Sequence, residues 1–290
     1  MFIINHRRIF YTLSGILILA SIFSLSVWGL NQGIDFKGGS LLEVTSPKNI
    51  DEVRNILVKD GFADASVRQS APGDFIIRLR EISQAEKDTI LASLPGATLK
   101  DFNIIGPTLG REAQIKSGLA ILFVILAIVL FITFAFRKVS RPISSWVYGS
   151  VAIIALVHDV IIPIGAFSIL GHLFGFEVDT LFVTAVLVIL GFSVHDTIVV
   201  FDRVRENLGK YEGKKQFDQI VGESISETFT RSVNTSLTTL LAITALYIWG
   251  PEPTHHFALA LLIGIVAGTY SSIFIGSPLL VTIQQWKNKK

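Results

Sequence analysis

The chain has 290 residues, of which 50% are hydrophobic and only 17% are charged, and its mean hydropathy is +0.58. Soluble domains usually carry about a quarter charged residues, so the composition excludes an ordinary soluble protein, and it equally excludes a disordered chain. The formal net charge of +2 is too close to zero to indicate a nucleic-acid partner, and the lack of cysteine excludes disulfides, thiol catalysis and Cys-ligated metal sites.

The first apolar segment, residues 9–30, carries no charge and is long enough to cross a bilayer, which takes about 20 apolar residues. A secretory signal peptide is the alternative, because His6, Arg7 and Arg8 precede the segment. The apolar run is too long for the core of a signal peptide, and no small-residue cleavage site follows it promptly. We therefore expect a retained anchor, with residues 1–30 forming the N-terminus and the first membrane helix.

Residues 31–116 differ from the rest of the chain, because charges return at ordinary density and the apolar runs shorten. Their periodicity predicts strands at 40–45, 65–69, 75–80 and 97–105 and helices at 49–60 and 83–94. Asn49 and the pair Ser83 and Glu86 fit the N-terminal caps of the two helices. The order βαββαβ is the ferredoxin-like arrangement, which hosts many functions and therefore names none.

Five further apolar segments follow this domain. They cover 117–136, a stretch within 143–176, 180–201, 232–250 and 257–283. We therefore expect an α-helical multi-pass membrane protein with six transmembrane helices and a small α+β ferredoxin-like domain between the first and second helices. A five-helix domain at 117–284 and a basic tail at 285–290 complete the predicted organisation.

Basic residues gather in the segments on one side of the expected spans. They are Arg7, Arg8, Arg137, Lys138, Arg141, Arg203, Arg205, Lys210, Lys214, Lys215, Arg231, Lys287, Lys289 and Lys290. The opposite short loops, 171–179 and 250–256, contain no Lys or Arg. Cytoplasmic loops carry an excess of basic residues, so we predict that both termini are cytoplasmic and that residues 31–116 are extracytoplasmic. The same rule explains the basic stretch 203–215 better than contact with nucleic acid does.

Two acidic residues interrupt the predicted spans, and each follows a histidine: His158–Asp159 and His195–Asp196. Placing Asp at a helix centre costs about 2.5–3.5 kcal/mol, so intramembrane acids are by default functional. The functional interpretation is a proton or ion relay, and the structural alternative is a pair of buried hydrogen bonds that holds helices together. Expected depths of about 20 Å for Asp159 and about 8 Å for Asp196 from the cytoplasmic edge indicate no direct contact between the carboxylates.

Arg231 opens the fifth span on the side where Asp196 is expected. An ion pair between Asp196 and Arg231 is one interpretation, and an arginine that extends to the interface from a helix end is the other. Hydroxyl side chains follow Arg231, and they either line a hydrated path or bond between helices. They are Ser232, Thr235, Ser236, Thr238 and Thr239.

The sixth span carries a small residue at every fourth position, which places these residues on one helix face. They are Ala260, Gly264, Gly268, Ser272 and Gly276. This spacing predicts close helix packing, with a sliding surface as the alternative. His255 and His256 have no further ligand at a suitable spacing, so no metal site is expected. No phosphate loop, serine-nucleophile motif or metalloprotease helix is present, so we expect no enzyme.

Six motifs in chain order resemble the SecF branch of the SecD/SecF family, membrane subunits of the bacterial protein-export machinery within the RND superfamily. The motifs lie at 33–39 (GIDFKGG), 106–110 (GPTLG), 155–160 (ALVHDV), 191–207, 231–239 and 268–272 (GTYSS), and together they span essentially the whole chain. The resemblance implies a plasma-membrane subunit that pairs with SecD, joins the SecYEG channel and has YajC and YidC as further partners. It also implies that the proton gradient, with no cofactor, helps to pull unfolded polypeptide outward.

The resemblance also assigns roles to single residues. It places the family's proton-linked acid at Asp196, its basic residue at Arg231 and its histidine–aspartate motif at His158 and Asp159. His195 stands where many relatives carry Asn, which adds a second titratable group beside Asp196. We therefore expect the pH response of this chain to differ from that of such relatives.

Three other classes compete with this interpretation. An RND-like exporter half for small molecules or lipids needs a larger outer domain than about 85 residues with one small core. A structural scaffold subunit predicts that Asp196→Asn leaves activity intact when the complex still assembles. A membrane enzyme lacks any recognisable nucleophile or metal cluster.

Overall fold

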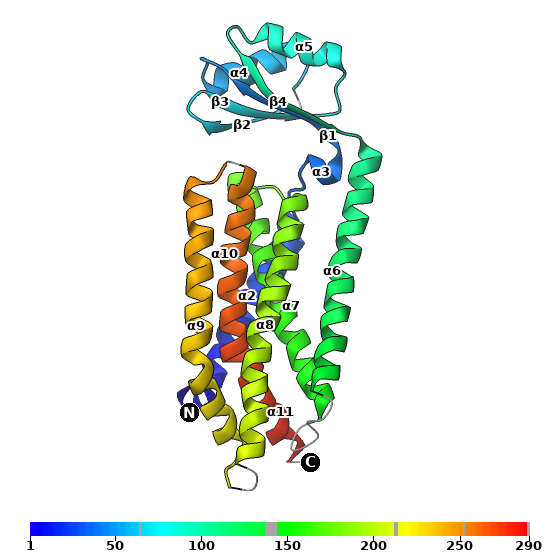
Figure 1. Ribbon diagram of the computed structural model, residues 1–290. Helices are drawn as coiled ribbons and strands as arrows, with labels where there is room; N and C mark the ends of the chain where they lie inside the picture. The colour runs from blue at the N-terminus through cyan, green and yellow to red at the C-terminus, as the bar shows by residue number, and fades with distance from the viewer. Residues whose placement is uncertain (64, 137–143, 212–213, 252, 289–290) are drawn as a thin grey trace. The chain divides into compact units, whose positions relative to one another are not determined.

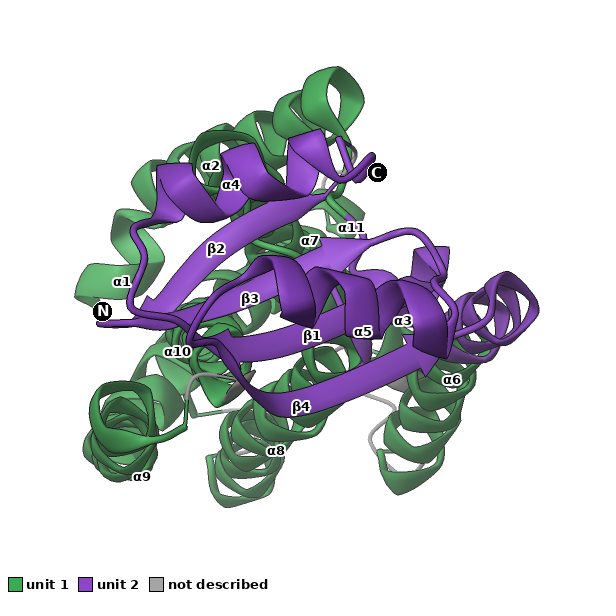
Figure 2. Ribbon diagram, turned by 90° about the horizontal axis from the view of Figure 1, so that it is seen from above, with its two compact units in different colours: residues 1–31, 119–177, 181–290 green, residues 32–118, 178–180 purple. Residues whose placement is uncertain are grey.

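The computed structural model describes residues 1–63, 65–136, 144–211, 214–251 and 253–288. The chain forms two compact units, shown in Figure 2. Unit 1 comprises residues 1–31, 119–177 and 181–290, and unit 2 comprises residues 32–118 and 178–180. Of the basic residues used to predict orientation, Arg137, Lys138, Arg141, Lys289 and Lys290 lie outside the described residues.

The described residues of unit 2 form four strands and three short helices. They are β1 (Gly39–Thr45), β2 (Ser66–Ala71), β3 (Asp74–Leu79), β4 (Thr98–Ile105), α3 (Ile34–Lys37), α4 (Ile50–Lys59) and α5 (Gln84–Ser93). The strands form one sheet in the order β2-β3-β1-β4, and every neighbouring pair is antiparallel. Between α3 and α6 the elements follow the order βαββαβ, which confirms the predicted ferredoxin-like α+β fold.

The core of unit 2 lies between the sheet and its two longer helices. Alternate residues of the central strands, such as Leu42 of β1 and Phe75 of β3, are fully buried. They meet Val53 and Leu57 of α4 and Ile90 of α5 in one hydrophobic cluster. Figure 2 shows α4 and α5 on the same face of the sheet. Each such side chain contributes about 1.5–3 kcal/mol by its burial, which fixes the register of the sheet.

Both predicted helix caps of unit 2 are present. Asn49 Oδ1 accepts from the Glu52 N–H at 2.9 Å, and Ser83 and Glu86 form a reciprocal capping box. The Ser83 N–H, then Arg80, then the Ser83 hydroxyl lower the pKa of Glu86 to about 2. The Glu86 carboxylate therefore stays ionised, and the start of α5 stays capped, throughout the physiological pH range.

Unit 1 is made of long helices that run side by side in Figure 1. Its helices are α1 (Phe2–Asn5), α2 (Arg7–Trp28), α7 (Ser145–Phe174), α9 (Phe217–Trp249), α10 (Pro253–Ser271), the π-helical turn η1 (Ser272–Gly276) and α11 (Ser277–Lys287). Helices α6 (Pro107–Ala135) and α8 (Thr180–Lys210) begin in unit 2 and continue into unit 1.

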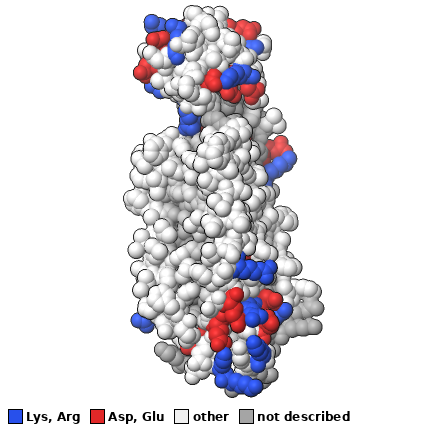
Figure 3. Space-filling view, turned by 60° about the vertical axis from the view of Figure 1, so that its left-hand side comes forward, with Lys and Arg blue, Asp and Glu red and all other residues white. Residues whose placement is uncertain are grey.

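Six helical stretches of the described chain are long and apolar enough to cross a bilayer. They are α2, α6, α7, α8, α9 and the continuous run of α10, η1 and α11. This confirms the predicted six-helix membrane protein. Helices α8 and α9 extend beyond the predicted spans, since α8 continues to Lys210 and α9 already begins at Phe217. On the face that Figure 3 shows, the charged side chains of unit 1 gather at one end, and the middle of the unit is almost free of them.

Helices α2 and α7 pack closely at Gly165 of α7. A Cβ atom added to Gly165 would lie 2.5 Å from Ser21 Cα, which is closer than real Cβ atoms approach. Ser24 Oγ donates to the Gly165 carbonyl at 3.1 Å. Small residues at such a crossing let two membrane helices pack backbone against backbone.

Helices α8 and α10 pack through two rows of residues that each advance by four positions. The facing pairs are Gly264 with Ile189, Gly268 with Ser193, Ser272 with Thr197, and Gly276 with Phe201. A Cβ added to Gly264 would collide with Ile189, and one added to Gly268 would lie 3.1 Å from Ser193 Cβ. Ridges at i±4 spacing commonly interdigitate in this way. Ala260, the first residue of the small-residue row, is fully buried.

Helix α6 is strongly apolar, yet few residues of its apolar stretch are fully buried. Its ring contacts with α7 and α8 lie at its C-terminal end. There the ring of Phe136, the residue after α6, stacks on Tyr148 with centroids 5.2 Å apart, and Phe201 meets both rings edge-on. Ile132 is fully buried at the same end. An aromatic cluster therefore joins one end of α6 to α7 and α8.

Candidate functional site

Asp159 lies at the centre of a buried polar network in unit 1. Its carboxylate is 0% exposed and uses both oxygens. Oδ1 is 2.8 Å from His158 Nδ1, and Oδ2 accepts from Ser193 Oγ of α8 and, at 2.7 Å, from Ser271 Oγ of α10. Buried carboxylates are tolerated when their hydrogen-bonding capacity is met, so this network holds α7, α8 and α10 together.

His158 extends the network to the first membrane helix. Its ring is 2% exposed, and Nε2 lies 3.1 Å from Ser14 Oγ of α2. The ring also stacks against Tyr270 of α10 with centroids 6.1 Å apart. The histidine therefore uses both ring nitrogens, and the His158–Asp159 pair links four membrane helices.

Asp196 lies on the same helix as Ser193, one turn further along α8. Its side chain is only 6% exposed, and Oδ2 has no hydrogen-bond partner among the described residues. Ser232 of α9 faces the Asp196 carboxyl group. The Ser232 hydroxyl also forms no well-aligned hydrogen bond with any described residue. A buried carboxylate oxygen without a partner is costly, so this position has a free acceptor for a proton or a cation.

Hydroxyl groups continue from the Asp159 network toward the level of Asp196. Thr197 Oγ1 and Ser272 Oγ lie 2.8 Å apart, and Ser272 Oγ also donates to the Ser193 carbonyl at 3.4 Å. Ser272 begins the π-helical turn η1, and Ser277 Oγ donates to the Ser272 carbonyl at 3.1 Å. Such π turns are rare and frequently occur at functional sites.

The two carboxylates do not bond to each other in the structure. Ser193, the partner of Asp159, precedes Asp196 by three residues, a rise of about 4.5 Å along α8. The expected depths put Asp159 and Asp196 further apart than this single helical turn. The expectation took the membrane edge at Phe201, whereas α8 continues to Lys210.

Arg231 and His195 lie outside the buried network. Both side chains are exposed, and neither makes a hydrogen bond or an ion pair with any described residue. Arg231 is therefore not in contact with Asp196, and the adjacent Ser232 takes that place. The structure brings together His158 and Asp159 and puts Asp196 one turn away, but it leaves the two other candidates on exposed helix faces.

Sequence reasoning missed three serines that complete the site: Ser14, Ser193 and Ser271. A weak signal was available, because Ser193 lies three residues before Asp196 and therefore on the same helix face. Serines also recur at 14, 21 and 24 within the otherwise apolar first span, and all three are buried. Buried serines in membrane helices usually hydrogen-bond between helices, as Ser14 and Ser24 do here with α7.

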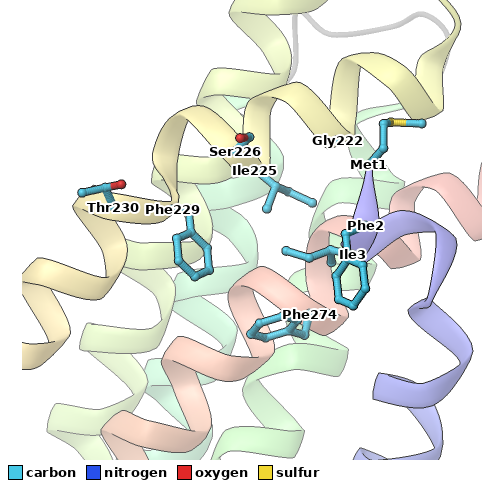
Figure 4. Close-up of a pocket in the computed structure, with 9 residues that line it drawn as sticks. All are labelled: Met1, Phe2, Ile3, Gly222, Ile225, Ser226, Phe229, Thr230 and Phe274. Carbon is cyan, nitrogen blue, oxygen red and sulfur yellow. The ribbon is translucent and has the colours of Figure 1, made fainter.

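Unit 1 contains two cavities of similar size, and one of them reaches this network. One of about 530 Å³, shown in Figure 4, lies between the N-terminal residues, α9 and η1, and Phe229 and Phe274 line it. Another of about 490 Å³ lies among α2, α7 and α10, and His158 and Tyr270 are the polar residues of its otherwise apolar wall. Among the described residues, no group of three or more His, Cys, Asp or Glu could hold a metal ion.

Comparison with protein families gives two matches. The family "Protein export membrane protein SecD/SecF, C-terminal" matches residues 87–286, and the family "SecD/SecF GG Motif" matches residues 23–46. A protein translocase subunit SecF from Thermobaculum terrenum is 45% identical over 99% of this chain and 94% of its own length. One from Anaerolinea thermophila is 37% identical over 99% of this chain and 96% of its own length.

The solved structures include a chain of the same architecture. The crystal structure of SecDF, a translocon-associated membrane protein from Thermus thermophilus, has a TM-score of 0.85 and 33% identity. The match covers 98% of this chain and 38% of that chain, so this chain spans well under half of the solved protein. A second structure, of SecDF in a super-membrane-facing form, has a TM-score of 0.68 and 32% identity.

Proposed function

This chain belongs to the SecD/SecF family of protein export membrane proteins, and we propose that it is an auxiliary translocase subunit that uses the proton-motive force to promote polypeptide export. In this proposal it pairs with a SecD subunit and joins the SecYEG channel, with YajC and YidC as further partners. The relatives are named as translocase subunits, and the solved relative is a translocon-associated SecDF. The family is one of transport proteins rather than enzymes.

The observation that carries the proton-coupling proposal is the contrast between the two buried carboxylates. Both carboxylate oxygens of Asp159 have hydrogen-bond partners, whereas Asp196 Oδ2 has none among the described residues. Protonation of Asp196 Oδ2 breaks no existing hydrogen bond of that oxygen. Protonation of Asp159 would disturb its hydrogen bonds to residues of α7, α8 and α10. We therefore assign proton uptake and release to Asp196 and a positioning role to Asp159 and His158.

The energy available for such a cycle is sufficient for a modest conformational change. One charge that crosses 100 mV is worth about 2.3 kcal/mol. A proton that binds at Asp196 removes a negative charge next to Ser232 of α9. The same charge lies one helical turn from Ser193, which belongs to the Asp159 network. The residues best placed to respond are therefore on α8, α9 and the π turn at Ser272.

The test of this function is an export assay in membrane vesicles that contain the channel, SecD and this chain. We expect this chain to accelerate export when a proton gradient is present, and we expect the acceleration to vanish when an uncoupler collapses the gradient. ATP is held constant, and vesicles without this chain serve as the control. Acceleration that persists after the gradient has collapsed would contradict proton coupling and favour a scaffold role.

We also propose that both termini are cytoplasmic and that residues 31–116 are extracytoplasmic. Because the chain has no cysteine, single cysteines report on topology without background. Ala85 of α5 and Lys210 of α8 are both exposed. In intact spheroplasts, a membrane-impermeant maleimide should label the Ala85→Cys variant and should label Lys210→Cys only after permeabilisation. The reverse pattern would refute the orientation.

A further inference from the structure

The segment through which the chain enters unit 2, Gly33–Gly39, contacts the first residue of α8. Asp35 Oδ2 accepts from the Thr180 backbone N–H at 3.0 Å and from the Thr180 hydroxyl. Thr180 begins α8, so its N–H has no partner within the helix. Asp35 therefore caps α8 from a position 145 residues earlier in the chain.

Backbone contacts hold the residues just before α8 against the same segment. The Gly33 N–H donates to the Val178 carbonyl at 2.9 Å, and Gln32 forms a parallel β-bridge with Val178. Val178 is 5% exposed. The start of α8 is thus joined to the entry segment by main-chain bonds as well as by the Asp35 side chain.

The opposite side of the same segment packs on the start of α6. A Cβ added to Gly110 would lie 2.8 Å from the Phe36 carbonyl oxygen, and one added to Gly38 would lie 2.8 Å from Pro107 Cα. Gly38 also has φ +77°, a conformation that favours glycine. The two glycine motifs, 33–39 and 106–110, therefore meet in a close backbone contact.

The segment leads directly into the sheet. Gly39 is the first residue of β1, and it pairs with Ile105, the last residue of β4. The contacts of Asp35, Gly38 and Gly110 therefore lie where the two strands end.

We propose that Asp35 is a positioning residue that couples α8 to the sheet of unit 2. Helix α8 runs without interruption from Thr180 to Lys210, and Asp196 lies about 24 Å along it from Thr180. The proposal rests on the proposed function, in which α8 responds to the protonation of Asp196. It adds the path by which that response reaches the extramembrane domain.

The test compares two substitutions of Asp35 in the assembled translocase. Asp35→Ala removes the cap, and loss of an N-cap costs about 1 kcal/mol, so export should fall about fivefold. Asp35→Asn keeps an acceptor of the same shape and caps equally well, so it should export at the wild-type rate. Equal loss in both variants would overturn the proposal, because the charge rather than the cap would then matter.

A spectroscopic readout separates failure of this coupling from failure of the proposed function. Infrared spectra of the protein in liposomes show a band for each protonated carboxyl group. The band that disappears in Asp196→Asn belongs to Asp196 and reports its protonation. In Asp35→Ala the band should titrate as in the wild type while export falls. If the wild type shows no such band, the proposed function fails. If Asp35→Ala loses the band, Asp35 supports the site itself, and the coupling proposal is wrong.

A cysteine pair provides a second test when Asp35→Ala fails to assemble. The chain has no other cysteine, so the double variant Asp35→Cys/Thr180→Cys places a single switchable bond at this contact. Export should be about fivefold lower in the reduced than in the oxidised state, because only the bonded state restores the link between the segment and α8. Equal export in both states, or a block by oxidation, would overturn the proposal.

Discussion

Replacing Asp196 by asparagine should abolish the gradient-dependent part of export while the subunit still pairs with SecD. Asparagine has the shape of aspartate, so packing against Ser232 is retained, but it takes up and releases no proton. A charge moving through 100 mV is worth about 2.3 kcal/mol, so the acceleration should fall by more than about tenfold. Export rates of cells whose only copy carries Asp196→Asn measure this, together with protein level and recovery of SecD.

The matched control is Asp202→Asn, an acid-to-amide change on the same helix. Asp202 is exposed and pairs with Arg205, so its loss should leave export within about twofold of the wild type, as expected for a surface ion pair. Unchanged export in Asp196→Asn would make that residue a packing group and would turn attention to Asp159. Loss of SecD in the same variant would instead indicate a structural role.

Replacing Gly165 by alanine should strongly destabilise the membrane unit. The added methyl group would meet the Ser21 backbone at 2.5 Å, so α2 and α7 must separate. Overpacking of this kind costs typically about 1–3 kcal/mol, and separation also stretches the bond between Ser24 and the Gly165 carbonyl. Unfolding of the purified protein in detergent, followed by temperature or denaturant, should show the loss.

Gly15→Ala is the control for this prediction. Gly15 lies on α2, and a Cβ added there has open space within 4 Å. Because alanine is a better helix former than glycine, the variant should be as stable as the wild type or slightly more stable. Equal stability of Gly165→Ala and Gly15→Ala would contradict the prediction. It would show that α2 and α7 can move apart without loss of stability.

The architecture was predictable from the sequence because its signals are local. Apolar runs of membrane length identify all six spans, and alternation with capping residues such as Ser83 and Glu86 identifies the βαββαβ domain. The end of α8 was less predictable, because α8 continues beyond the apolar stretch as a polar helix. Its extension to Lys210 depends on packing between α8 and α9, where Asn207 bonds Ser224. The early start of α9 was predictable, because Phe217, Val221, Ile225 and Phe229 recur at helical spacing before the apolar stretch.

The candidate site was predictable only in part. The acids Asp159 and Asp196 stand out in apolar spans, because a carboxylate there is costly. Their partners do not stand out, since a serine such as Ser271 looks the same in sequence whether it bonds its own helix or another. The ion pair between Asp196 and Arg231 was expected because both residues were placed near the same edge of the membrane. Neighbouring residues of a helix point about 100° apart, so Ser232 faces the site and Arg231 does not.

The apolar length of α6, with few fully buried residues, has a consequence for biogenesis. A helix inserts into the bilayer because its own apolar segment is long enough. Its packing against neighbouring helices is a later and separate step. Helix α6 has the first property in full, and the aromatic cluster around Phe136 and Tyr148 at its C-terminal end contributes to the second. Insertion of this span during synthesis therefore does not wait for α7–α11 to be made, and its exposed side is left to meet lipid.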